Sequence, residues 1–127
     1  PQERAELWVR VGALRARSLD DRDGAAAAYR EALDAVPGDR GALLALESLE
    51  EERADWNALE EVLLQHLQVT SGDEVHEVLF RLVENADKRL EDRDRAVGYL
   101  KQILDANPSE PRAVAHLERL LAAGEQW

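Results

Sequence analysis

The feature that most constrains the fold of this chain is an internal repeat of 71 residues. When residues 6–56 are placed on residues 77–127 without gaps, 16 of the 51 aligned positions are identical. The block at residues 19–23, for example, recurs at residues 90–94. Self-similarity at a fixed period is typical of repeat proteins, in which each unit packs against its neighbours. The length of the chain therefore reflects the number of repeated units that it contains.

A half-period of about 35 residues is also visible. The apolar residues that begin corresponding segments are spaced 35, 36 and 35 residues apart: Trp8, Leu43, Leu79 and Val114. Each is followed three residues later by a second apolar residue: Val11, Leu46, Leu82 and Leu117. Spacing of i, i+3 marks one face of an α-helix. Each period of 71 residues thus predicts two helical hairpins.

Capping and turn signals divide the chain into helices. Asp21, Asp55 and Asp92 each lie four residues before a small or apolar anchor, where a carboxylate can accept from the free N–H groups of a starting helix. Turns containing Pro or Gly separate the other segments. No segment alternates polar and apolar residues for long enough to be a strand. The pattern predicts seven helices, at residues 2–18, 21–36, 39–52, 55–70, 73–89, 92–106 and 109–123.

The amino-acid composition favours helices, and the net charge disfavours some classes of binding partner. Leu and Ala dominate the 127 residues, which include no Cys and no Met. The net charge of -11 opposes binding to nucleic acid or to an anionic membrane. Most of the basic residues are Arg, a bias typical of GC-rich bacterial genomes. Because the chain opens on Pro1 without an initiator Met, we expect it to be a piece of a longer protein.

The first unit carries a set of residues with a fixed spacing: Trp8, Val11, Gly12, Ala25, Tyr29, Ala32, Leu33 and Pro37. They are similar to the W-x-x-L-G, A-x-x-x-F/Y and closing P of the tetratricopeptide repeat (TPR) family, which this unit therefore resembles. The third unit keeps part of this pattern: Leu79, Leu82, Ala96, Leu100 and Pro108. The resemblance implies an all-α fold, a right-handed superhelical solenoid of antiparallel helix hairpins.

The second unit departs from the TPR pattern. Glu47 and His66 stand where small residues are usual, and Ser71 replaces the closing proline. Units one and three also carry one extra residue in the turn between their helices. The resemblance covers the whole chain. We expect a single TPR-like domain with repeats at residues 5–38, 39–72 and 73–108 and the first helix of a further repeat at 109–127.

Two sets of residues are predicted to build the core. Antiparallel helices approach closely only where a side chain is nearly absent, which favours a row of small residues: Gly12, Ala25, Ala28, Ala32, Ala96 and Ala113. Large residues then fill the gaps between helices: Trp8, Tyr29, Leu33, Leu43, Leu46, Leu63, Leu67, Leu79, Leu82, Leu100, Leu104 and Leu117.

The resemblance also implies a concave face, lined by the first helix of each repeat, that binds a protein or peptide. Helical spacing places nine candidate partner-binding residues there: Arg10, Arg17, Leu44, Ser48, Glu51, Phe80, Glu84, Asp87 and Arg119. Phe80 lies one residue beyond a core position, so it either anchors a partner or packs sideways onto the neighbouring repeat. Some TPR domains clamp the terminal carboxylate of a chaperone tail with Lys and Asn. This face of the first two repeats offers neither residue.

Four glutamates gather at the end of one predicted helix: Glu47, Glu50, Glu51 and Glu52. The helix dipole makes negative charge unfavourable at that end. The cluster therefore either attracts a basic partner or is ordinary solvated surface.

No pattern for catalysis or for a metal site is complete. His76 and Glu77 begin like the zinc motif HExxH, but Phe80 stands where the second His is required. His66 fits a contact between helices, and His116 is an isolated surface residue. We therefore expect no enzyme activity, no metal and no cofactor.

The function favoured by the sequence is a protein-protein interaction scaffold that binds a partner protein or peptide. One alternative is a structural spacer or a self-association module, with apolar surface exposed on the flank after His116 and Leu120. Another is RNA binding, since helical hairpins of similar length occur in pentatricopeptide RNA readers. Those proteins need a basic groove, which disfavours RNA for this chain.

Overall fold

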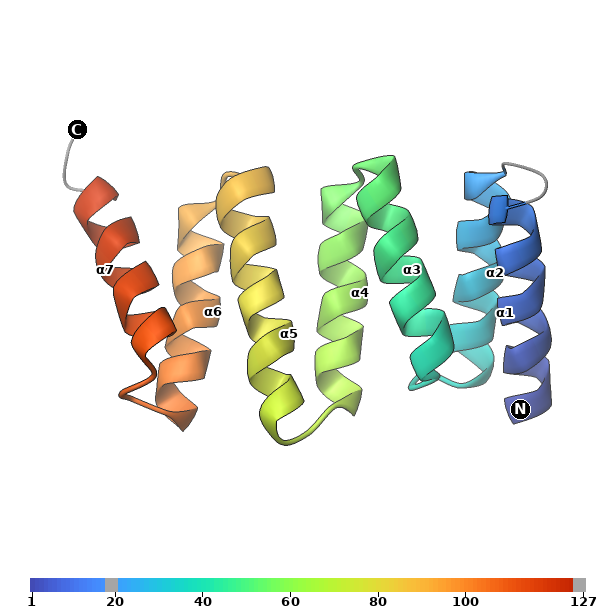
Figure 1. Ribbon diagram of the computed structural model, residues 1–127, viewed down its shortest axis with the longest axis horizontal. Coiled ribbons are helices and arrows are strands. Elements are labelled where there is room, and N and C mark those ends of the chain that lie inside the picture. Colours follow the sequence, from blue (N-terminus) through green and yellow to red (C-terminus); the bar gives the residue numbers. More distant parts are fainter. Residues whose placement is uncertain (18–20, 125–127) are drawn as a thin grey trace. The chain divides into compact units, whose positions relative to one another are not determined.

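The computed structural model describes residues 1–17 and 21–124, which are helical almost throughout (Figure 1). The described residues hold seven α-helices, one π-helical turn and no strand. The elements are α1 (Gln2–Arg17), α2 (Arg22–Ala35), α3 (Arg40–Arg53), α4 (Trp56–Val69), α5 (Asp73–Glu84), η1 (Asn85–Arg89), α6 (Arg93–Ala106) and α7 (Pro111–Gly124). The seven predicted helices are confirmed. Residue 18 of the first predicted helix and residues 125–127 of the last predicted repeat lie outside the described residues.

Aspartates start the helices where the sequence predicts them. Asp21 accepts a hydrogen bond from Gly24 N at 2.8 Å, Asp55 from Ala58 N at 3.2 Å, and Asp92 from Arg95 N at 3.1 Å. Each bond satisfies one of the N–H groups that a helix leaves free in its first turn. Two further carboxylates cap helices in the same way, those of Asp39 on α3 and Glu110 on α7.

The helices group into two compact units, Pro1–Val69 with α1 to α4 and Thr70–Trp127 with α5 to α7. In each unit, helices that follow one another along the chain run antiparallel and pack together (Figure 1). The boundary between the units falls close to the predicted boundary between the second and third repeats.

Small residues line the contacts between helices. All six predicted small residues are buried, from Gly12 on α1 to Ala113 on α7. Most of the predicted large residues are buried as well, while four are only half-buried: Trp8, Leu67, Leu104 and Leu117. In these hairpins the small side chains let the backbones approach, and the Leu and Tyr side chains fill the remaining space.

The turns of the first and third hairpins are wider than the turn of the second. Asp92 N donates to Ala86 O at 2.8 Å, and Asp21 N donates to Arg15 O at 2.7 Å, so both bonds span six residues. In the second hairpin Asp55 N donates to Glu50 O across only five residues. The extra residue predicted for the first and third turns therefore closes a larger ring. In the third hairpin α5 passes into the π-turn η1, where the sequence predicts one continuous helix.

Two features relevant to membranes and metals are absent from the described part of the chain. None of its helices combines the length and apolar character that crossing a bilayer requires. It also holds no cluster of three or more His, Asp or Glu side chains arranged to bind a metal ion.

Candidate functional site

A groove of about 500 Å³ runs between α5 and α7 of the second unit. One wall is made by α5 and η1, which contribute Glu77, Phe80, Arg81, Glu84 and Lys88. The other wall is made by α7, which contributes Arg112, Ala115, His116 and Arg119. Both sets recur every three or four residues, so each is a single face of its helix. These two helices are the first helices of the last two repeats that the sequence predicts.

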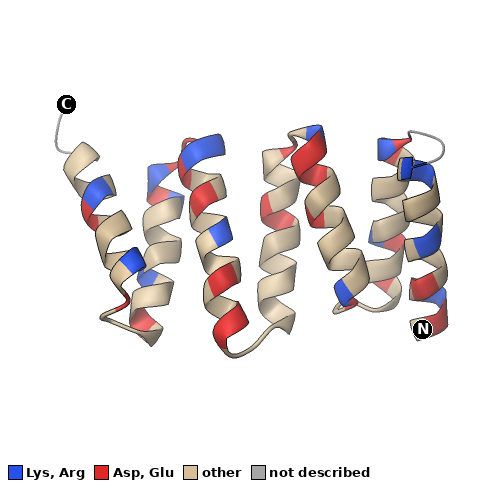
Figure 2. Ribbon diagram, in the orientation of Figure 1, with Lys and Arg blue, Asp and Glu red and all other residues tan. Residues whose placement is uncertain are grey.

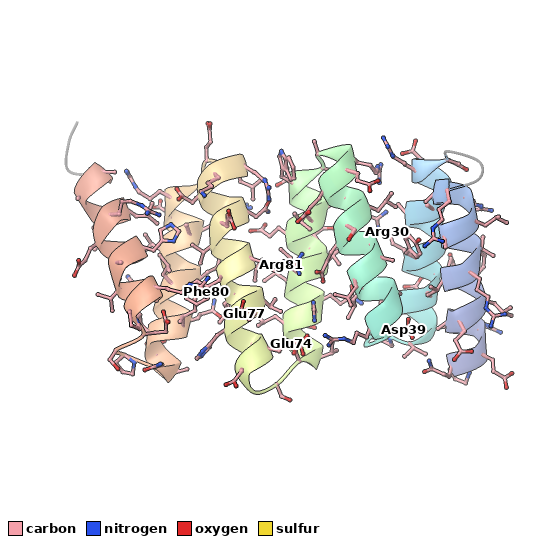
Figure 3. The ribbon with its side chains drawn as sticks, in the orientation of Figure 1. Arg30, Asp39, Glu74, Glu77, Phe80 and Arg81 are labelled. Atoms are coloured by element: carbon pink, nitrogen blue, oxygen red, sulfur yellow. The ribbon has the colours of Figure 1, made fainter. Side chains whose placement is uncertain are left out.

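An aromatic ring and a guanidinium group meet across this groove. Phe80 lies on the side of α5 that faces α7 (Figure 3), and Arg112 Cζ is 4.0 Å from the centroid of its ring. At this distance the cation is attracted to the face of the ring. Arg112 Nη1 is also 3.7 Å from Glu77 Oε1, although both of these side chains are more than half exposed. Arg112 is thus oriented across the groove by two residues of α5.

His116 connects the two walls at a second point. Its Nε2 lies 3.1 Å from Asp87 Oδ2, and both side chains are largely buried. An ionised carboxylate can only accept, so the histidine nitrogen donates this bond. Asp87 belongs to η1. Nearby, Lys88 Nζ and Glu84 Oε1 form an exposed pair at 3.3 Å.

The groove differs in charge from the rest of the chain. Four of its lining residues are Arg or Lys and two are Glu, whereas the chain as a whole carries a net charge of -11. Figure 2 shows basic residues on both α5 and α7. On the α7 wall no lining residue is acidic. The groove is therefore a local basic surface on an acidic protein.

The first unit has a related but less elaborate groove. It measures about 290 Å³ and is lined by Gln2, Glu6, Val9, Arg10, Asp39 and Gly41. On the 71-residue repeat, Val9 corresponds to Phe80 and Gly41 corresponds to Arg112. The position of Arg119 is occupied by Ser48. The ring, the stacked guanidinium and the second arginine are thus specific to the second unit.

The structure separates the predicted partner-binding residues into groups. Phe80, Glu84 and Arg119 line the groove of the second unit, and Asp87 contacts its His116. Arg10 lines the groove of the first unit. The other four are exposed on α1 and α3 and line neither groove: Arg17, Leu44, Ser48 and Glu51.

Sequence reasoning missed several residues of the second groove. Arg112 lies seven residues before Arg119, so helical spacing places both on one face of α7. His116 lies on this same face and pairs with Asp87, although the sequence predicts an isolated surface residue at this position. The spacing was sufficient to find Arg112, but the pairing across helices required the structure.

The glutamates at the end of α3 require a correction. Glu47 and Glu50 are not solvated surface, since their exposed fractions are 1% and 0%. Glu47 Oε2 lies 2.7 Å from His66 Nδ1 of α4, which confirms His66 as a contact between helices. The two large polar residues that depart from the TPR pattern therefore meet each other.

Glu50 is held by two arginines. Arg30 Nη2 of α2 donates to Glu50 Oε2 at 2.9 Å, and Arg53 Nη1 donates to Glu50 Oε1 at 2.7 Å. Arg53 also contacts Asp23 at 2.9 Å. Buried carboxylates with such partners belong to the packing of the first unit, so only Glu51 and Glu52 of the cluster are exposed.

Comparison with solved structures finds the same fold. The crystal structure of MamA, a TPR-containing protein, is similar with a TM-score of 0.64 and 21% sequence identity. The match covers 95% of this chain and 64% of the MamA chain. No protein-family model matches the sequence, and no curated protein matches it. The chain has a TPR-like helical repeat fold, an all-α array of antiparallel hairpins.

Proposed function

We propose that this chain is a protein-interaction module and that the groove between α5 and α7 binds a segment of a partner protein. A TPR-like repeat fold supports a scaffold of this general kind, because stacked hairpins present extended surfaces for binding. The observation that carries the proposal is the pairing of Phe80 with Arg112 across the groove. Aromatic and Arg side chains are the residues that most often dominate binding energy at interfaces.

The proposed activity is binding without chemistry. No Ser, Thr or Tyr lines the groove, and the chain has no Cys. His116 is engaged by Asp87, but the groove offers this pair no nucleophile to activate. The lining therefore suits recognition of charge and shape.

The test is a selection of random dodecapeptides, displayed on phage, against the whole chain. Ala115 is small and exposed in the groove, so Ala115→Trp fills the space without disturbing the core. Ala27→Trp is the matched control, because Ala27 is exposed on α2 and lines neither of the two grooves described above. We expect selected peptides to bind the chain and the control, and to bind Ala115→Trp at least about tenfold more weakly. If no peptide is enriched, or if Ala115→Trp binds equally well, this groove is not the binding site.

A self-association module is the second candidate function. Leu121 at the end of α7 is 52% exposed, and Leu7 and Leu14 of α1 are 60% and 57% exposed. The predicted flank is apolar in part, although Leu120 itself is buried. Sedimentation equilibrium distinguishes the two functions: a dimer that Leu121→Glu converts to a monomer favours self-association.

A further inference from the structure

We infer that the groove between α5 and α7 selects an acidic peptide segment whose carboxylates bind Arg112 and Arg119. This inference rests on the proposed function and adds the chemistry of the partner. It is carried by the charges of the groove, the orientation of Arg112 and the contrast with the related groove in the first unit.

The α7 wall of the groove presents positive charge. Its lining residues are Arg112, Ala115, His116 and Arg119, and none is acidic. Arg119 is exposed and has no ion pair among the described residues. Seven residues of α-helix place the two arginine backbones about 10 Å apart, with the small Ala115 between them. A ligand lying along this wall meets two guanidinium groups in succession.

Arg112 is oriented but not neutralised. Phe80 covers one face of its guanidinium at 4.0 Å, which leaves the N–H groups at the edge of the plane available. Glu77 lies 3.7 Å away, and its side chain is 68% exposed. An exposed pair at this distance contributes little. A partner carboxylate can therefore bind Arg112 without first breaking a strong internal ion pair.

The acidic residues of the groove lie on the opposite wall. Glu77 and Glu84 are on α5, where Glu77 pairs with Arg112 of α7 and Glu84 pairs with Lys88 of its own wall. The α5 wall thus carries two acidic and two basic lining residues, whereas the α7 wall carries two arginines and no acidic residue. A peptide with spaced carboxylates can follow the α7 wall, whereas the continuous phosphates of a nucleic acid would meet both the glutamates and the acidic surface beyond. The arrangement favours a peptide.

The related groove of the first unit lacks these features. The first unit has Val9, Gly41 and Ser48 at the positions of Phe80, Arg112 and Arg119, and Ser48 does not line its groove, while Arg10 matches Arg81. The framework is thus shared by the two units, and the residues that bind a carboxylate are present in only one. Packing of the repeat does not require these residues, since the first unit folds in the same way without them.

The spacing of the two arginines defines the partner further. An extended segment advances about 3.3 Å per residue, so carboxylates near three residues apart match a separation of about 10 Å. The expected ligand is an extended segment with two acidic side chains at roughly this interval. The remainder of the chain is acidic, so this segment binds by local contacts at the groove.

The experiment measures fluorescence anisotropy of labelled synthetic peptides with the whole chain. The acidic probes are Gly/Ser peptides that carry one Leu and two Glu, with the two Glu separated by one to four residues. Matched probes carry Gln or Lys in place of Glu. The test protein is Arg112→Gln with Arg119→Gln. The control is Arg93→Gln with Lys101→Gln, which removes the same charge from exposed residues outside the groove.

We expect acidic probes to bind at least about tenfold more tightly than their Gln counterparts, with affinity falling as salt is raised. The arginine double variant should lose this preference, and the control variant should keep it. Thermal unfolding of both variants checks that they fold. Arg112→Lys should bind with intermediate affinity, because it keeps the charge and loses the planar stacking on Phe80.

Three results would overturn the inference. The first is that no acidic probe binds more tightly than its Gln counterpart. The second is that the arginine double variant keeps the preference. The third is tighter binding of single-stranded oligouridylate than of any peptide. If Gln probes bind and Ala115→Trp blocks them, the proposed function stands and only the acidic preference is lost. If no peptide binds, the proposed function also fails.

Discussion

The backbone of Gly12 lies directly against the ring of Tyr29. A Cβ atom added at Gly12 would come within 2.5 Å of Tyr29 Cε1 and within 2.8 Å of two further ring atoms. Tyr29 is buried between α1 and the rest of the first unit, so its ring has little room to move. The glycine thus sets how closely α1 approaches α2.

Gly12→Ala should destabilise the protein by about 1–3 kcal/mol, because the added methyl group overpacks the hairpin. Gly98→Ala is the matched control, since Gly98 is exposed in α6 and has nothing within 4 Å of the added atom. That change should stabilise by about 0.5–1 kcal/mol through helix propensity. Urea unfolding followed by far-UV circular dichroism measures both changes. Stabilisation of both variants would contradict the close contact.

Glu50→Ala should lower the free energy of unfolding by about 2–3 kcal/mol, because it removes a fully buried carboxylate from Arg30 and Arg53. Glu52→Ala on the same helix should cost less than about 0.5 kcal/mol. The side chain of Glu52 is 61% exposed and lies 3.7 Å from Arg22. Urea unfolding measures both free energies of unfolding. An equal decrease for the two variants would show that the burial of Glu50 does not make it more important for stability than Glu52.

Ala54→Gly should stabilise the protein by about 0.5–1 kcal/mol. Ala54 ends α3 in the left-handed conformation, with φ 56° and ψ 32°, which is strained for a residue with a Cβ atom and favourable for glycine. Ala27→Gly, at an exposed position inside α2, should instead destabilise by about 1 kcal/mol. The shift in thermal midpoint should be upward for the first variant and downward for the second. A downward shift for Ala54→Gly refutes the assignment of strain.

Stability should fall above about pH 10, in part because of Tyr29. Burial raises the pKa of Tyr29 above its ordinary value of 10.0, while Arg17 lowers it and Glu52 raises it. The unfolded state then loses the phenol proton at a lower pH than the folded state, so rising pH favours unfolding. The slope contributed by one proton is at most about 1.4 kcal/mol per pH unit.

Tyr29→Phe should show a flatter decline above this pH, and Tyr99→Phe serves as the control for loss of a tyrosine hydroxyl. Urea unfolding at a series of pH values gives the slopes. Parallel slopes for the wild type and Tyr29→Phe would rule out the contribution of Tyr29.

Most of the fold follows from local signals in the sequence. The aspartates Asp21, Asp55 and Asp92 fix three helix starts, because a side chain that caps a helix acts on N–H groups only a few residues away. The small residues that face neighbouring helices can also be predicted, because their spacing in the sequence is that of one helix face. The π-turn at Asn85–Arg89 could not be predicted in this way. The wider helical turn there depends on how the third hairpin closes.

The site is harder to predict from the sequence, because it depends on pairs of residues that are distant along the chain. Phe80 can be identified as a candidate from the sequence alone. Its proposed role in binding, however, depends on its contact with Arg112, 32 residues further along the chain. Glu47 and His66 are similar: each departs from the TPR pattern, and the structure shows that each compensates the other. Two departures within one repeat were the available signal for such a pair.

The wide turns of the first and third hairpins have a consequence for how repeats of unequal length remain aligned. One residue inserted within an α-helix rotates everything beyond it by about 100°, which would turn the face behind it away from its neighbours. At Asp92 the added residue is enclosed in the turn instead, by the bond to Ala86 O, and Asp21 makes the matching bond to Arg15 O. The turn thus accommodates the difference in chain length outside the helices. The lining faces of α5 and α7 therefore keep their orientation toward the groove although the repeats differ by one residue.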